Sequence, residues 1–171
     1  MTTIINIYGG PGAGKSTLAE GVSHQLKMNG MGCELVREVV KEACWRGEKV
    51  NRPWDEFYLF GAQIRLEGAL YGKVDYIVTD RPIGMSLAYT MNDSLLCSTM
   101  EEMLTTVEAL RERQDVRTVD VHVRRGNKPF QKEGRFHDEA RSREIDRWCK
   151  NKFPGPVVSN VGDVIAALKL G

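Results

Sequence analysis

The stretch that decides the fold runs Gly9-Gly10-Pro11-Gly12-Ala13-Gly14-Lys15-Ser16-Thr17. It fits the pattern G-x-x-x-x-G-K-[ST], in which glycines let backbone N–H groups turn toward phosphate oxygens without interference from a Cβ atom. An apolar run at 4–8 precedes it, and a helical pattern follows it. Lys15 can then reach the β- and γ-phosphates, Ser16 can bind Mg²⁺, and the positive end of the helix faces the anion. The stretch therefore predicts a phosphate-binding loop for a nucleoside triphosphate.

Strand and helix patterns alternate outward from this loop. Strands are expected at 3–8, 33–36, 74–79, 116–124 and 156–159. Helices are expected at 15–29, 38–47, 54–71, 84–91, 94–114, 138–151 and 161–169. Such alternation favours a mostly parallel sheet with helices on both faces, and the length suits one domain. We therefore expect a single α/β domain over residues 1–171, a three-layer sandwich with about five strands.

Side-chain spacing predicts which faces are buried. Leu18, Val22 and Leu26 should form the buried face of the helix after the loop. In the strand 116–124, valines alternate with Asp120, His122 and Arg124, which predicts one polar face. We therefore expect His122 to be half-exposed, and we assign no catalytic role to it, to His24 or to His137.

Composition limits the class of protein. The chain has 24 Lys and Arg against 23 Asp and Glu, so its formal charge of +1 does not require a polyanionic partner. Its 4 cysteines are scattered without a C-x-x-C pair, which disfavours a disulfide scaffold or a zinc site.

The amino terminus begins directly with a strand pattern, so no signal peptide is expected. No apolar run approaches the roughly 20 residues that span a bilayer. We expect a cytoplasmic protein without a membrane partner.

Polar residues follow two other predicted strands. Asp80 and Arg81 come directly after 74–79, and ligands of open α/β sheets gather at the carboxyl ends of strands. Asp80 can hold the hydration shell of Mg²⁺, and Arg81 can bind an anionic or polar acceptor group. Glu38 follows 33–36 and can accept a proton from an attacking hydroxyl. An ion pair on a helix surface is the alternative interpretation of Glu38.

A basic loop at 125–137, with Arg124 directly before it, is the predicted lid. Phosphoryl transfer needs cations that close over the γ-phosphate and exclude water. Arg124, Arg125 and Arg135 are the candidates, and Arg135 is favoured because Gly134 beside it can act as a hinge. We assign Arg124 to the bound nucleotide.

Two classes of P-loop protein are disfavoured. A regulatory GTPase would have Asp-x-x-Gly where this chain has Asp80-Arg81-Pro82-Ile83, and Asn-Lys-x-Asp where it has Asn127-Lys128-Pro129-Phe130. A motor ATPase would have an acidic pair after the metal-binding strand and a further helical domain, and we see neither.

With these residues identified, the chain resembles the small P-loop kinases of nucleosides, nucleotides and related metabolites. It is most similar to the ATPase/kinase group that includes nicotinamide riboside kinases and small phage kinases. The blocks 9–17, 38–42, 80–89 and 134–135 carry the resemblance. The Asp-Arg…Ser-x-x-Tyr block is also similar to thymidylate and deoxynucleoside kinases.

The resemblance implies ATP and Mg²⁺ as cofactors, with Glu38 or Asp80 as base, Arg81 as acceptor contact and Arg135 as lid cation. It implies a nucleoside-type acceptor, either free or within DNA, such as a hydroxymethylpyrimidine. The acceptor would lie between helices 54–71 and 84–114, in a cleft that could be lined by Trp45, Trp54, Phe57, Tyr58 and Gln63. Core packing is the favoured interpretation of Phe57. One departure leaves the acceptor open, since Glu38 is followed by Val39 and not by proline.

The hypothesis at this stage is an ATP- and Mg²⁺-dependent phosphotransferase. The alternative is a nucleotide-binding regulatory ATPase without a small-molecule acceptor. The oligomeric state stays open.

Overall fold

The computed structural model describes residues 1–171 except 51, 127–128, 134 and 170–171. Its sheet has five parallel strands in the order β2-β3-β1-β4-β5. These strands are β1 (Thr2–Tyr8), β2 (Cys33–Val36), β3 (Tyr76–Thr79), β4 (Val116–Val123) and β5 (Val157–Val158). The predicted α/β fold with about five mostly parallel strands is confirmed, and every pairing is parallel.

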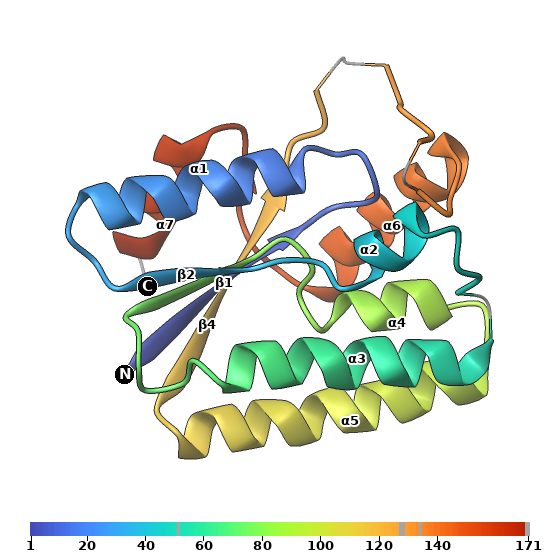
Figure 1. The fold of residues 1–171 in the computed structure, drawn as a ribbon, viewed down its shortest axis with the longest axis horizontal. Helices are drawn as coiled ribbons and strands as arrows, with labels where there is room; N and C mark the ends of the chain where they lie inside the picture. The colour runs from blue at the N-terminus through green and yellow to red at the C-terminus, as the bar shows by residue number, and fades with distance from the viewer. Residues whose placement is uncertain (51, 127–128, 134, 170–171) are drawn as a thin grey trace.

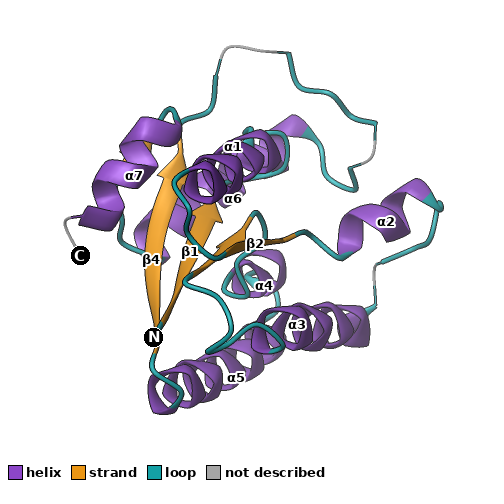
Figure 2. Cartoon of the chain, turned by 60° about the vertical axis from the view of Figure 1, so that its left-hand side comes forward, coloured by secondary structure: helices purple, strands orange, loops and turns teal. Residues whose placement is uncertain are grey.

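Helices cover both faces of the sheet. They are α1 (Lys15–Met28), α2 (Val40–Trp45), α3 (Pro53–Gly68), α4 (Met85–Thr90), α5 (Ser94–Arg113), α6 (Glu139–Lys152) and α7 (Val161–Lys169). Figure 1 shows α1 and α7 on one side of the sheet and α3 and α5 on the other, and Figure 2 shows the same layers from another direction. The architecture is therefore the expected three-layer sandwich.

Each layer contact has its own apolar core. Leu18, Val22 and Leu26 of α1 are buried with β1, β4 and α7 in one cluster, which confirms the predicted face of that helix. The opposite cluster joins α3, α4, α5 and α6, with Phe60 and Met100 fully buried at its centre. Burial of apolar surface on both faces fixes the sheet between the two helix layers.

Several elements are shorter than the sequence predicts. The helix expected at 38–47 extends only over α2, so Glu38 lies outside it, and Gly47 with φ +70° follows its end. The strand expected at 74–79 begins at Tyr76, after a turn in which Gly72 has φ +71°. Left-handed glycines end helices readily because they have no Cβ atom.

The expected exposure of His122 is wrong. His122 is only 2 % exposed. Its ring stacks on that of Tyr8 with the centroids 5.5 Å apart, and its Nε2 lies 2.6 Å from the Phe153 carbonyl oxygen. Asp120 on the same face accepts a hydrogen bond of 2.7 Å from the Asn6 side chain. Asp120 and His122 of β4 thus find polar partners within the protein because helices cover this face of the sheet.

The strand order brings the predicted site residues together. β1 pairs with β3, and β2 pairs with β3 on its other side. The loop after β1, Asp80 after β3 and Glu38 after β2 therefore lie at one edge of the sheet. Among the described residues, no helix is both long enough and apolar enough to cross a membrane.

Candidate active site

The phosphate-binding loop connects β1 to α1 as the sequence predicts. Gly12 and Gly14 have φ of +75° and +103°, a left-handed conformation that favours glycine. Lys15 is 9 % exposed and donates a hydrogen bond of 3.2 Å to the Gly10 carbonyl oxygen across the loop. Burial lowers the pKa of Lys15, although Glu38 and Asp80 oppose this shift. A buried ammonium in a loop of left-handed glycines fits the binding of an anion such as phosphate.

Helix α6 holds this loop from behind. The Gly10 N–H donates to Asp146 Oδ1 at 2.5 Å, and Ser142 Oγ donates to the Pro11 carbonyl oxygen at 2.6 Å. A Cβ atom at Gly10 would overlap the backbone carbonyl of Ser142. Glycine is therefore required at this position by the close approach of α6.

The predicted metal residues are in contact. Ser16 Oγ donates to Asp80 Oδ2 at 2.5 Å, and Asp80 Oδ1 accepts from the Glu38 backbone N–H at 3.0 Å. Hydroxyl and carboxylate oxygens are ligands that suit Mg²⁺, so these residues fit the ion. The described residues contain no cluster of three or more His, Cys, Asp or Glu that could hold a metal. Mg²⁺ here would therefore depend on Ser16, Asp80, water and the phosphates of a nucleotide.

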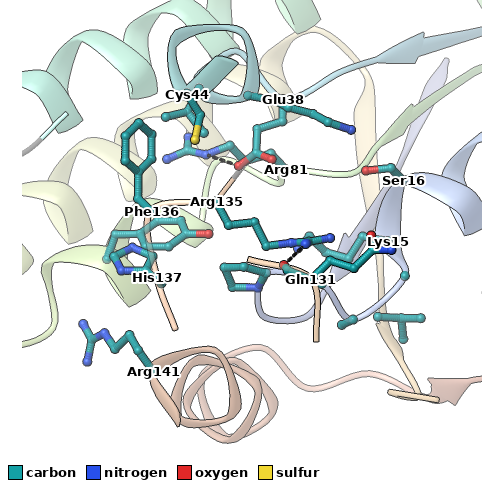
Figure 3. A pocket seen from close by; sticks show the side chains of 18 of the residues that line it. Lys15, Ser16, Glu38, Cys44, Arg81, Gln131, Arg135, Phe136, His137 and Arg141 are labelled. Atoms are coloured by element: carbon teal, nitrogen blue, oxygen red, sulfur yellow. Dashed lines mark hydrogen bonds and ion pairs between the residues drawn. The ribbon is translucent and has the colours of Figure 1, made fainter. Parts of the chain in front are cut away.

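Arg81 is buried between two carboxylates. Its side chain is 1 % exposed, with Nη2 2.8 Å from Glu56 Oε1 and Nε 3.6 Å from Glu38 Oε1. Its guanidinium also lies over the Tyr89 ring, 5.4 Å from the centroid. Burial disfavours the charged guanidinium, but Glu56 and Glu38 outweigh this effect and raise the pKa of Arg81. Figure 3 shows the Glu38 carboxylate next to the Arg81 guanidinium, with their ion pair drawn as a dashed line.

Arg135 of the predicted lid lies beside the phosphate-binding loop. Arg135 lies with its guanidinium over the Phe130 ring and donates to the Gln131 carbonyl oxygen. A Cβ atom built on Gly12 would lie 3.3 Å from Arg135 Nε, so this cation is directly beside the phosphate-binding loop. Figure 3 shows its side chain extending toward Lys15. The predicted hinge Gly134 lies outside the described residues, as do Asn127 and Lys128.

Arg125 is held by α6 and the phosphate-binding loop. Its Nε lies 2.8 Å from Asp146 Oδ2, and its Nη2 donates to Ser142 Oγ at 2.5 Å and to the Pro11 carbonyl oxygen at 3.3 Å. Through these contacts Arg125 links α6 to the phosphate-binding loop. Arg124 is exposed and lines the cavity.

One cavity of about 1460 Å³ joins these residues. On one side of the phosphate-binding loop it is lined by Arg124 and residues 159–161, and beyond Glu38 it is lined by residues of α2, α3, α4 and the lid. The side next to β5 includes Ser159, Asn160 and Val161. The sequence analysis placed them at the end of a strand and the start of a helix but assigned none of them to the site. The cavity is large enough for two small ligands placed end to end.

The expected lining of the acceptor half is mostly wrong. Of the five residues proposed for it, only Trp45 is among the described lining residues. Trp54 and Tyr58 are exposed, and Gln63 is buried with its Nε2 donating to Thr79 Oγ1 at 3.3 Å. Phe57 packs against the core, which is the interpretation that the sequence favoured for it. The rotation of α3 decides this, since it turns Asp55, Glu56 and Leu59 toward the cavity.

Three residues of this half had no specific role in the sequence analysis. Glu56 contacts Arg81, and Tyr89 lies between Arg81 and the lid. His137 stacks on Tyr89 with ring centroids 5.4 Å apart, and burial lowers its pKa, as does Arg141. The Ser-x-x-Tyr spacing signals Tyr89, whereas nothing in the sequence separates Glu56 from the other acidic residues of its helix.

Comparisons with known proteins agree with this geometry. A family model described as an AAA domain matches residues 4–158. A mutant of the APS kinase of Mycobacterium tuberculosis is similar in structure, with a TM-score of 0.53, 10% identity, and coverage of 99% of this chain and 96% of that one. A deoxyadenosine kinase from M. mycoides, solved with dCMP and a flexible dCDP, has a TM-score of 0.50, 17% identity and the same coverages, 99% and 96%. No curated protein matches the sequence. The solved structures share a P-loop kinase-like fold with this chain.

Proposed function

Since the chain belongs to the AAA domain family and has a P-loop kinase-like fold, we propose that it is an ATP- and Mg²⁺-dependent phosphotransferase. It transfers the γ-phosphoryl group of ATP to a nucleoside-type acceptor. That acceptor is a nucleoside, a nucleotide, or a nucleotide within DNA such as a hydroxymethylpyrimidine. The proposal treats residues 1–171 as one kinase domain with a lid at 125–137, located in the cytoplasm, where its four free cysteines stay reduced.

The observation that carries the proposal is the continuity of the cavity. It extends from the phosphate-binding loop to a second half that contains Glu38 and Arg81. Hydrolysis needs only a water molecule beside the γ-phosphate, whereas transfer needs space for a second substrate next to it. The second half, with its carboxylate and aromatic side chains, supplies that space.

The residues have the following proposed roles. Lys15 and the N–H groups of the loop bind the β- and γ-phosphates, and Arg135 stabilises charge on the transferred group. Arg124 contacts the nucleotide beside residues 159–161. Ser16 and Asp80 hold Mg²⁺, which neutralises phosphate charge when it is bound. Catalysis is then mostly positioning and electrostatic stabilisation.

Glu38 is favoured over Asp80 as the base. Both carboxylate oxygens of Asp80 already accept hydrogen bonds, from Ser16 and from the Glu38 backbone. Glu38 lines the cavity. The acceptor oxygen bonds to the γ-phosphorus, its proton passes to Glu38, and the bond to the bridging oxygen breaks to release ADP.

The test is transfer of labelled γ-phosphate from ATP to a panel of acceptors. The panel holds nucleosides, nucleoside monophosphates, nicotinamide riboside, 5′-hydroxyl oligonucleotides and hydroxymethylpyrimidine-containing DNA. We expect Lys15→Ala to lower turnover by about 10²-fold or more, because it removes a cation from the transferring phosphate. Lys27→Ala is the matched control, since Lys27 is an exposed residue of the same helix, paired with Glu34. Wild-type turnover by Lys15→Ala would refute the site.

A regulatory ATPase without an acceptor is the second candidate, and a match to an AAA domain is compatible with it. In that case ATP would be hydrolysed at the same rate with and without every acceptor, and no acceptor would be labelled. Negligible hydrolysis alone, with transfer once an acceptor is added, would support the kinase.

A further inference from the structure

The acceptor half of the cavity has an unusual balance of charge around Arg81. One guanidinium lies against two carboxylates, 2.8 Å from Glu56 and 3.6 Å from Glu38. The three side chains therefore carry a formal charge of −1 at neutral pH. Both glutamates are largely shielded, with side chains 14% and 22% exposed, so water screens these charges only partly.

Arg81 nevertheless retains unused donors. Its Nε and Nη1 are buried and make no hydrogen bond among the described residues, and of the two only Nε faces an ion-pair partner, Glu38 at 3.6 Å. A buried N–H group without an acceptor is costly, and native structures rarely leave one unpaired. The Nη1 atom of Arg81, which lines the cavity, therefore indicates a place for an oxygen atom of a ligand.

The surrounding cations do not offset the negative charge. Arg52 is paired with Asp55, and Arg141 with Glu144 at 2.6 Å. Lys41 is exposed where it lines the cavity, so water solvates its ammonium and screens its attraction for a phosphate. Two further cations of the cavity, Lys15 and Arg135, lie at the phosphate-binding loop. A phosphate monoester beside Arg81 would therefore meet two carboxylates and a guanidinium that is already paired with both.

We infer that the acceptor presents an uncharged oxygen, a hydroxyl or a carbonyl, to Arg81, and that Glu56 is a specificity-determining residue that excludes a phosphate monoester from this position. The inference rests on the proposed function and narrows its acceptor to compounds that carry no phosphate at this end. Glu56 acts here by charge, through repulsion of the phosphate and occupation of Arg81, and takes no part in the chemical step.

The experiment compares each of thymidine, deoxycytidine, deoxyadenosine and deoxyguanosine with its 5′-monophosphate. The ratio of kcat/KM within each pair is measured, and calorimetry gives the affinity of each compound in the presence of a nonhydrolysable ATP analogue. We expect the wild type to favour the nucleoside. Glu56→Gln should move the ratio toward the monophosphate by about tenfold or more, because it removes one like charge a few ångströms away.

The matched control is Glu102→Gln, which removes one carboxylate from the exposed surface of α5, outside the cavity. It should leave the ratio unchanged, and thermal unfolding checks that both variants fold. A wild type that favours the monophosphates would overturn the inference, as would a ratio that Glu56→Gln does not move. Failure to bind either member of every pair would also overturn it. Labelled phosphate on another acceptor of the panel would then leave the proposed function standing.

Discussion

At the scale of single residues, Asp120 is a half-buried carboxylate that the proposed chemistry does not use. It accepts a hydrogen bond from Asn6 inside the layer between β4 and the helices. Burial raises the pKa of Asp120, although the hydrogen bond from Asn6 and the nearby His122 oppose this shift. An acid with a raised pKa in the folded protein binds its proton more tightly there than in the unfolded chain. The free energy of unfolding therefore falls as the pH rises from the pKa of Asp120 in the unfolded chain to its higher pKa in the folded protein.

We predict that Asp120→Asn raises the free energy of unfolding at pH 7. The amide keeps an oxygen for Asn6 and removes the half-buried charge. The advantage should shrink as the pH falls toward 4, where both states of the wild type become protonated. Urea unfolding at several pH values measures it, with Glu112→Gln as an exposed control. An advantage independent of pH would show that the charge is not its cause.

At the scale of elements, α6 is the support of the phosphate-binding loop. Asp146 accepts from the Gly10 N–H and pairs with Arg125, so one side chain joins α6, the loop and the start of the lid. Ser142 lies one turn earlier and contacts Pro11 on the same face. Residues four apart on a helix share a face, which explains why these two meet the loop together.

We predict that Asp146→Ala weakens both the fold and the nucleotide site. The loss of a charged acceptor for Gly10 and Arg125 should lower the free energy of unfolding by about 2–3 kcal/mol. The affinity for ATP should also fall, because the loop loses the contact that positions Gly10. Urea unfolding and ATP titration measure the two effects. Glu139→Ala removes an exposed ion pair of the same helix and should change stability by less than about 1 kcal/mol. Unchanged ATP affinity in Asp146→Ala would contradict this role of α6.

At the scale of the whole molecule, the residues of the candidate site come from the sheet and from both helix layers. The loop follows the central strand, Glu38 precedes α2, Glu56 lies in α3, and Asp146 comes from α6. A ligand that bridges these elements binds only the folded chain. Its binding therefore adds to the stability of the entire protein.

We predict that ATP with Mg²⁺ raises the free energy of unfolding by about 2.7 kcal/mol at a ligand concentration 100 times Kd. Thermal unfolding measures the increase. Removal of Mg²⁺ with EDTA should reduce it, since Ser16 and Asp80 then lack the ion that joins them to the phosphates. In Lys15→Ala, most of the increase in the free energy of unfolding caused by ATP should be lost. An increase that is the same with EDTA would argue against a metal at Ser16 and Asp80.

Local chemistry made several features predictable from the sequence. The glycines, Lys15 and Ser16 identified the phosphate-binding loop, because left-handed turns and phosphate contacts need those residue types at that spacing. The alternation of strand and helix patterns gave the parallel sheet, and the position of Asp80 after its strand placed it near Ser16. Each of these inferences used residues close together in the chain or a general rule of α/β topology.

Tertiary structure decided the contacts between distant residues. Arg81 and Glu56 are 25 positions apart, and Gly10 and Asp146 are 136 apart, so no local pattern links them. The sequence likewise predicted a half-exposed His122, which is in fact buried, since alternation marks a polar face but not whether another layer covers it. The sequence by itself determined the fold class, and it placed Lys15, Ser16 and Asp80 at the end of the sheet where we propose that phosphate and metal bind. Only packing of the helices on the sheet determined the charges around the acceptor, because the rotation of α3 and the approach of α6 depend on burying their apolar faces.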